Sequence, residues 1–412
     1  MSSLRDKLQV LRGDRKTGTH DAQATSTIAE RVAHLRGLPS DRPRLDVAET
    51  VAAQTGGRVV APHVVCIEER LSISALHGSG QLQRICGALS SSLLPAPAER
   101  IIFLDTETTG LAGGTGTVAF LVGWIEVTPQ AVTLHQYIIT AFAGEAAMLE
   151  AVAKALEDTS TLVTFNGKTF DQPLLMTRFR LHGIECDAGR LRHADLLHPT
   201  RRAFGRRWPD CRLQTCENRL LAVRRHNDIP GHEIPMVWFD LLRSGTTGAL
   251  VQVIAHNRVD LLSLAMLLPA LDAVFYDPQG YAADVAAVAR YWHARDEPAR
   301  AIELLARQSN MTDAERIDLA RWYRQMDDWN AAVELWEQGA VRHCCESLLN
   351  LAKYREHRQH DYTAAMHMVD RLLYVDANNE EYRRRYERLQ RKIAAKNMPE
   401  ETVDASDFNK EG

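Results

Sequence analysis

Two acidic residues follow an apolar, strand-like run in the segment IIFLDTETTG, residues 101–110. Asp105 and Glu107 are two positions apart, and because successive strand residues point to opposite faces, both carboxylates project from the same face. Carboxylates so close repel each other unless a cation lies between them. The spacing therefore favours a metal site, although an isolated acid pair at a strand end more often only faces water.

Two later segments supply further candidate ligands. In LVTFNGKTFDQPLL, a strand-like run is followed by Asn166, Phe170 and Asp171 at the start of a helical pattern. The simpler role for Asp171 is to cap that helix. In IAHNRVDLLSL, His256 and Asp260 are four residues apart and share one face of a helix, where a solvated pair is the simpler explanation. The order of the three segments together indicates one site.

Hydrophobic periodicity predicts the elements that position these residues. The strand-like runs cover residues 101–105, 117–127, 134–140, 161–165 and, more briefly, 193–197. Helical spacing covers residues 144–158 and 171–183. Three successive strands followed by alternating helices and strands predict a mixed sheet with helices on its faces.

The last third of the chain repeats itself. Tyr291, Tyr323 and Tyr354 recur at intervals of 32 and 31 residues, each before a charged turn and an Ala-rich helical pattern. This is close to the ~34-residue tetratricopeptide period, and an irregular helical bundle is the alternative.

These patterns divide the chain into four parts. We expect an N-terminal lead-in that is partly disordered with a short strand and helix segment, a mixed-sheet domain that carries the candidate ligands, tetratricopeptide-like helical repeats, and a disordered acidic tail. Their predicted bounds are residues 1–98, 99–275, 281–395 and 396–412.

Composition adds little about partners. The 412 residues are 45% hydrophobic and 25% charged with a net charge of -4, which is ordinary for a soluble protein and does not itself indicate nucleic acid. Seven cysteines are sparse, and the opening MSSLRDKLQVLRG lacks the apolar core of a signal peptide. We therefore expect a cytoplasmic protein, and no apolar run reaches the ~20 residues of a membrane helix.

The three acidic segments, in this order, are similar to the DEDD exonucleases (DnaQ-like) of the ribonuclease H-like superfamily, over residues 101 to about 272. The continuation RLLAVRRHNDIPGHEIPMVWFDLLRSG followed by HNRVDLLSL resembles the YprB-type ribonuclease H-like family, which can carry helical repeats downstream. The resemblance implies an α/β fold, a ribonuclease H-like mixed five-stranded sheet flanked by helices, before an all-α repeat module. One departure is that three residues separate His256 from Asp260, the spacing of a subgroup with Tyr in place of His.

The family resemblance implies a metal-dependent 3′-5′ exonuclease that hydrolyses phosphodiester bonds of single-stranded DNA or RNA. Two Mg²⁺ or Mn²⁺ ions about 3.5–4 Å apart activate water and stabilise the leaving oxygen in such enzymes. By resemblance, Asp105 bridges both ions, Glu107 and Asp260 hold the ion on the nucleophile side, and Asp171 holds the other. His256, with an ordinary pKa near ~6.5, is the expected general base.

Further residues are expected to bind the substrate. The resemblance implies a wall beside the terminal nucleotide, with Asn166 at its sugar or phosphate and Phe170 nearby. The wall residues are Thr106, Thr108, Thr109 and Gly110. The segment from Arg178 to Arg225 is rich in arginine, with aromatic residues interleaved, which favours phosphate and base contacts as much as a solvated helix surface. The arginines singled out are Arg201, Arg202, Arg206 and Arg207.

Some alternatives stay open. The same fold would also serve a non-catalytic nucleic-acid-binding or scaffold protein, or an endonuclease, and the repeats would recruit a protein partner. Residues in the arginine-rich segment also invite a structural zinc site, although their spacing fits no familiar pattern well. They are His193, His198, Cys211 and Cys216.

Overall fold

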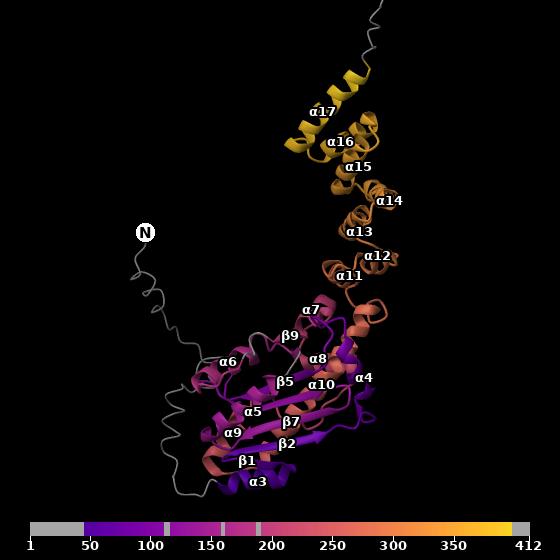
Figure 1. Cartoon of the computed structure of the whole chain (residues 1–412). Helices are drawn as coiled ribbons and strands as arrows, with labels where there is room; N and C mark the ends of the chain where they lie inside the picture. Colours follow the sequence, from indigo (N-terminus) through magenta and orange to yellow (C-terminus); the bar gives the residue numbers. More distant parts are fainter. Residues whose placement is uncertain (1–44, 111–115, 158–160, 187–190, 398–412) are drawn as a thin grey trace, which may run out of the picture.

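Seven strands form one mixed sheet in the computed structural model of the protein (Figure 1), which describes residues 45–110, 116–157, 161–186 and 191–397. The strand order is β1-β2-β7-β6-β5-β8-β9. Neighbours from β1 to β5 are antiparallel, whereas β8 runs parallel to β5 and β9 parallel to β8. The strands are β1 (Arg58–Ala61), β2 (Val64–Arg70), β5 (Ile101–Thr108), β6 (Ala119–Val127), β7 (Val132–Ile139), β8 (Thr161–Thr164) and β9 (Arg192–Asp195). A separate hairpin joins β3 (Leu76–His77) to β4 (Gly80–Gln81).

The predicted mixed sheet flanked by helices is confirmed, but the expected number of five strands is wrong. Strands β5 to β9 are the five that the sequence indicated, and β1 and β2 extend the sheet beside β7. Both extra strands come from residues 58–70, which were assigned to the lead-in, whereas residues 1–44 lie outside the described part. The sequence shows strand-like alternation there but gives no sign of its distant partner, β7.

The two faces of β5 belong to different hydrophobic cores. Ile101 and Phe103 pack on the side of helix α10 (Gly248–Tyr276), whereas Ile102 and Leu104 pack on the opposite side. The helices of that opposite side are α3 (Leu45–Thr55), α5 (Glu145–Glu157), α6 (Asp171–Leu181) and α9 (Ile234–Ser244). The alternation predicted for β5 therefore places Asp105 and Glu107 on the face that α10 covers.

Gly123 of β6 lets α10 approach the sheet. It lies opposite Asp105 of β5 on one side and Gln136 of β7 on the other. A Cβ at Gly123 would lie only 2.2 Å from the Asn257 side-chain oxygen and 2.7 Å from Leu261 Cδ1. Only a residue without a side chain fits between the sheet and the helix at this position.

Helix α10 is long and apolar enough to cross a membrane by length and composition alone. In this structure 61% of its most apolar 18-residue window is buried inside the protein, where it contacts β5, β6 and α4 (Gln83–Cys86). Its apolar composition is therefore explained by burial in the core.

Helices continue from α10 to the end of the described chain and extend away from the sheet (Figure 1). Each packs against the next. They are α11 (Val285–Ala294), α12 (Pro298–Ala306), α13 (Asp313–Gln325), α14 (Trp329–Val341), α15 (Cys345–His357), α16 (Tyr362–Val375) and α17 (Glu380–Lys396). Ala301, Ala332 and Ala365 are fully buried in α12, α14 and α16, which is compatible with the predicted tetratricopeptide-like repeats. Most of the predicted tail, residues 398–412, lies outside the described residues.

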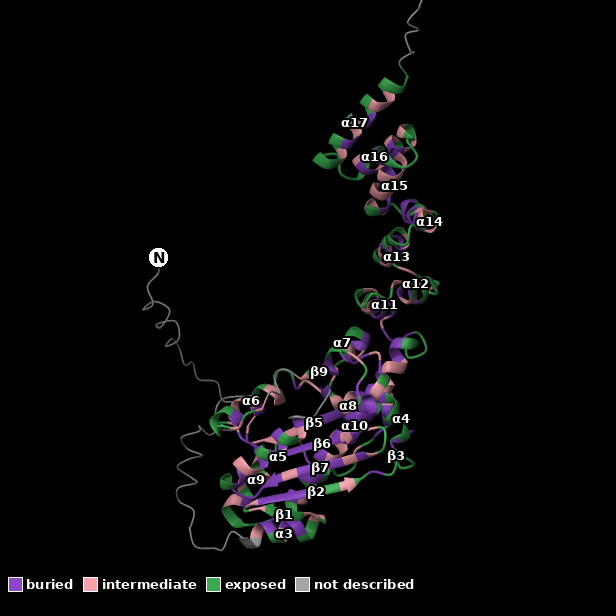
Figure 2. Cartoon of the chain, viewed as in Figure 1, coloured by how far each residue is buried: buried purple, intermediate pink, exposed green. Residues whose placement is uncertain are grey.

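The helical region shares its core with the sheet domain. One continuous cluster of buried side chains runs from Phe103 of β5 through Phe275 of α10 to Leu389 of α17. Buried residues accordingly follow the inner sides of the helices as well as the strands (Figure 2). At the junction, the Trp292 indole donates a hydrogen bond to the Phe275 carbonyl at 2.9 Å, and α7 (Leu197–Phe204) contacts α11.

We predict that Gly123→Ala lowers the free energy of unfolding by about 1–3 kcal/mol, because its new methyl group has no room between β6 and α10. Urea denaturation in EDTA measures this change. Gly87→Ala is the matched control, since a Cβ there meets nothing within 4 Å, and it should change stability by less than about 0.5 kcal/mol. Equal effects of the two substitutions would contradict the tight contact.

Candidate functional site

Four carboxylates from three elements meet at the carboxyl end of β5. Asp105 and Glu107 come from β5, Asp171 is the first residue of α6, and Asp260 lies in the middle of α10. Burial, followed by the negative charges of the other acids, holds the pKa of Asp105 and of Glu107 well above the usual carboxyl range. Burial also raises the pKa of Asp171 to about 6, although a hydrogen bond from Thr106 opposes the shift. The structure thus brings together all four acids predicted from sequence.

The donor atoms of this cluster suit a divalent cation. Ligand atoms of Glu107, His256 and Asp260 all lie within 4.8 Å of one another. Among the described residues, these three side chains form a group that could hold a metal ion. Mg²⁺ and Mn²⁺ prefer oxygen ligands, and the other two carboxylates adjoin this group. The chemistry of the donor set therefore fits the metal that the sequence predicted.

Asn257 fixes the position of Asp105. Its side-chain nitrogen donates to Asp105 Oδ2 at 2.8 Å, and its oxygen accepts from Gln136 Nε2 at 2.9 Å. Gln136 also donates to the Ile254 carbonyl of α10 at 2.9 Å. Since Asp105, Gly123 and Gln136 form one row across three strands, the fully buried Asn257 locks α10 to that row. Sequence analysis missed Asn257, although it directly follows His256.

Asp171 is positioned by the loop between β8 and α6. Asp195, at the end of β9, accepts hydrogen bonds from the backbone N–H of Asn166 at 2.7 Å and of Lys168 at 3.1 Å. Asn166 has a φ of 67°, in the left-handed region that Asn tolerates better than most residues. Thr106 then donates its hydroxyl to Asp171 Oδ1 at 2.6 Å. Asp195 was also missed, because its role depends on contacts distant in sequence.

The zinc alternative finds no support among these residues. His193 uses both ring nitrogens within the protein, at 2.8 Å from Thr164 Oγ1 and 3.1 Å from Gln172 Oε1. Cys216 is buried in the hydrophobic core, and burial raises the pKa of its thiol to about 12. His193 instead supports the segment that carries Asp171.

His256 lies between two acids. Its Nδ1 is 2.7 Å from Asp228 Oδ1, and its Nε2 is 3.3 Å from Asp260 Oδ2. Burial lowers the pKa of the imidazole, but the hydrogen bonds and charges of Asp260 and Asp228 outweigh that effect and raise it to about 9. The neighbouring acids therefore move the pKa of this histidine above its ordinary value, and the charge on Asp260 must be neutralised before His256 can accept a proton at neutral pH. Sequence analysis missed Asp228.

A buried arginine also reaches the cluster. Arg225 donates to Glu217 through Nε at 2.8 Å and Nη2 at 2.6 Å, to Asp228 through Nη1 at 2.9 Å, and to Asp260 through Nη2. Glu217 belongs to η3 (Glu217–Leu221), a π-helical turn after α8 (Leu213–Cys216). Arg225 and Asp228 are close in sequence, in the motif RRHND. Only the fold shows that they lie near Asp260 of α10.

The acids and Arg225 open into a cavity of about 540 Å³. Its lining combines charged groups with apolar side chains and backbone from α8 and the segment before α9. The lining residues are Asp105, Phe165, Leu213, Gln214, Arg225, Asp228, Ile229, Pro230, Gly231, His256 and Asp260. Asp105 and Asp260 of the acid cluster are therefore reached from this cavity.

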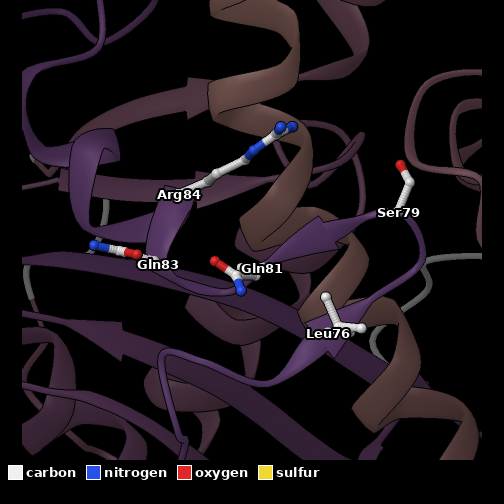
Figure 3. A pocket seen from close by; sticks show the side chains of 5 residues that line it. All are labelled: Leu76, Ser79, Gln81, Gln83 and Arg84. Carbon is white, nitrogen blue, oxygen red and sulfur yellow. The ribbon is translucent and has the colours of Figure 1, made fainter.

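A second hollow of about 570 Å³ lies at the β3–β4 hairpin (Figure 3). Its lining residues are Leu76, Ser79, Gln81, Gln83 and Arg84. Arg84 supplies the one charge in this lining, so the hollow lacks the paired acids and bases that the first cavity has.

The predicted wall residues have defined partners. The Thr109 hydroxyl is buried and accepts from the Val118 N–H at 3.0 Å, and the Thr108 hydroxyl donates to the Gly110 carbonyl at 3.0 Å. These hydroxyls, like that of Thr106, hold the protein's own groups. Phe170 differs, because 54% of it is exposed immediately before Asp171.

The predicted arginine cluster lies elsewhere on the domain. Its four members are exposed on α7 and the turn that follows it, and they do not line the carboxylate cavity. Arg202 lies over the Tyr291 ring of α11 at 5.3 Å, and Arg206 is 3.9 Å from Asp284. Phe204 is buried and stacks on Trp208 with ring centres 3.8 Å apart, so it cannot stack on bases as its interleaved position indicated.

Comparison with known proteins gives three findings. A family model described as RNase_H superfamily matches residues 102–271. A Bacillus subtilis (strain 168) protein named "Uncharacterized protein YprB" is 32% identical over 288 residues, which cover 66% of this chain and 69% of that protein. A family B DNA polymerase of the hyperthermophilic archaeon Pyrobaculum calidifontis aligns at 14% identity and a TM-score of 0.36, over 62% of this chain and 35% of the polymerase chain.

We predict that the interactions of His256 with Asp228 and Asp260 stabilise the fold. This stabilisation is complete below about pH 6.5, the pKa of an unfolded histidine, and is lost as the pH rises through about 9. His256→Gln should therefore lose less free energy of unfolding than the wild type between these pH values, because Gln carries no proton to release. Urea denaturation in EDTA across this range measures the difference.

His232→Gln provides the control, since the side chain of His232 is 78% exposed and should contribute no such slope. If His256→Gln and the wild type lose stability in parallel, the pairing of His256 with Asp228 and Asp260 contributes nothing to folding.

Proposed function

The chain belongs to the ribonuclease H superfamily, in the family of YprB, and from this premise we propose that it is a metal-dependent nuclease. We assign it the removal of nucleotides from the 3′ end of single-stranded DNA or RNA. The observation that carries the proposal is the convergence of Asp105, Glu107, Asp171 and Asp260 from three separate elements. Four half-buried acids that repel one another destabilise a fold unless they bind a cation.

The four acids would hold two Mg²⁺ or Mn²⁺ ions. Bound there, the ions supply an activated water and neutralise the charge that grows on the leaving oxygen. Asn257 holds Asp105, and Thr106 holds Asp171, so both carboxylates are oriented before any ligand arrives. Orientation in advance lowers the cost of reorganisation during the reaction.

His256 is the residue we assign to receive the proton of the attacking water. Asp228 engages its Nδ1, which directs Nε2 towards Asp260 and the ligand cluster. Asp228 is therefore a positioning residue that selects which ring nitrogen faces the reaction.

Substrate recognition is expected to use two surfaces. The exposed ring of Phe170 adjoins Asp171 and offers a platform for the terminal base. The arginine cluster of α7 would bind phosphates farther along the strand. The helices α11 to α17 would recruit a protein partner.

We predict that Asp105→Asn lowers the rate of hydrolysis by about 10³-fold, the scale of removing a group that acts electrostatically in the transition state. The same substitution should leave the thermal midpoint in EDTA unchanged or higher, because it removes one of the repelling charges. Single-stranded DNA and RNA labelled at either end, with Mg²⁺, Mn²⁺ or EDTA, provide the assay.

Asp240→Asn is the matched control, since this acid is exposed at the end of α9 and pairs with Arg243. Undiminished hydrolysis by purified Asp105→Asn protein would sink the four-acid assignment. Stepwise shortening from the 3′ end supports an exonuclease, whereas internal fragments at early times would replace it with an endonuclease of the same fold.

Replacing the four arginines of the α7 cluster with alanine should weaken binding of single-stranded DNA and flatten its dependence on salt. Each lost phosphate contact lowers the slope of log K against log salt by about 0.7. Fluorescence anisotropy from about 50 to 200 mM NaCl measures this slope.

The control replaces four exposed arginines of the helical region and removes the same total charge. Its members are Arg324, Arg342, Arg358 and Arg391. If both quadruple variants reduce the slope equally, net charge rather than the α7 cluster governs binding.

A further inference from the structure

Arg225 is a cation built into the acidic cluster. Its side chain is only 9% exposed, and its guanidinium lies against three carboxylates, those of Glu217, Asp228 and Asp260. The pair with Glu217 is bidentate, at 2.8 and 2.6 Å. Glu217 itself is fully buried, and Arg225 is its cationic partner inside the protein.

The geometry divides the guanidinium into an anchored side and an exchangeable side. Nε and one N–H of Nη2 are committed to buried Glu217, whereas Nη2 also reaches Asp260 at the rim of the cavity. An arginine can maintain both because its planar fork carries five N–H donors. Losing the contact with Asp260 would therefore leave the bidentate pair with Glu217 intact.

Two cations therefore compete for the carboxylate of Asp260. One is Arg225, and the other is the divalent ion that would sit between Glu107, His256 and Asp260. Both draw on the negative charge of the same carboxylate, so each weakens the binding of the other.

We propose that Arg225 is a positioning residue that neutralises Asp260 while the metal site is empty. When a divalent metal binds, Arg225 loses its contact with Asp260 and keeps its bidentate pair with Glu217. The inference rests on the proposed metal-dependent function. Arg225 thereby keeps the acids together in the absence of metal and sets the metal concentration at which the site fills.

Mn²⁺ binding to the full chain, measured by isothermal titration calorimetry without substrate, tests the competition. The double variant Glu217→Gln with Arg225→Gln removes both buried charges together, so no orphan carboxylate remains in the core. We expect its Kd for Mn²⁺ to fall about tenfold below that of the wild type. Glu217→Gln alone should raise the Kd, because Arg225 then has one fewer carboxylate to share its charge.

Two further variants complete the design. Arg224→Gln is the matched control, since Arg224 is the exposed neighbour of Arg225 and its loss should leave the Kd within about twofold. Arg225→Lys covers the case in which the double variant does not fold, as judged by circular dichroism and thermal unfolding in EDTA. A lysine cannot hold Glu217 bidentately and reach Asp260 at once, so it should also lower the Kd.

The outcomes separate this inference from the proposed function. Tighter Mn²⁺ binding by the double variant, or by Arg225→Lys, supports the exchange. If the wild type binds Mn²⁺ as tightly as these variants or more tightly, Arg225 does not compete with the metal for Asp260. The nuclease proposal would still stand. Absence of Mn²⁺ binding in the wild type and in every variant overturns both.

Discussion

Mutual repulsion among half-buried carboxylates is the constraint on which the rest of this structure depends. Asp105, Glu107, Asp171 and Asp260 would separate if each belonged to a mobile segment. They instead come from the middle of a mixed sheet, the first turn of one helix and the centre of another, so that moving one acid means moving an entire element. The energy of packing two hydrophobic cores on the faces of β5 thus opposes the repulsion at its end.

Residues next to the acids hold them in place against their mutual repulsion. Gly123 provides the clearance that Asn257 needs, and Asn257 ties the helix to the acid on the opposite strand. On the far side, Asp195 gathers the N–H groups of the loop before α6. The amide of Asn257 is a neutral donor, so it orients Asp105 without adding another charge to the cluster.

The spacing and order of three segments, with the family resemblance, predicted the acids, whereas the groups that control them depend on distant contacts. A period of two puts Asp105 and Glu107 on one face, and a separation of four does the same for His256 and Asp260. The sheet and its flanking helices followed from similar periodicity. The place of β1 and β2 in the sheet was not predicted, because β2 pairs with β7, more than 60 residues away, and β1 pairs only with β2. The pKa of His256 could not be anticipated either, because Asp228 reaches it from a loop 28 residues earlier.

Helix α10 is also a mechanical element. Asp260 lies near its middle and Phe275 near its end, a separation of about 22 Å at the rise of an α-helix. Phe275 accepts the Trp292 hydrogen bond that starts the helical array, and the two regions share one core. The array is therefore joined to the helix that carries Asp260 by this hydrogen bond and by the shared core. A molecule bound by α11 to α17 would thus be tethered to the protein through the helix that carries Asp260.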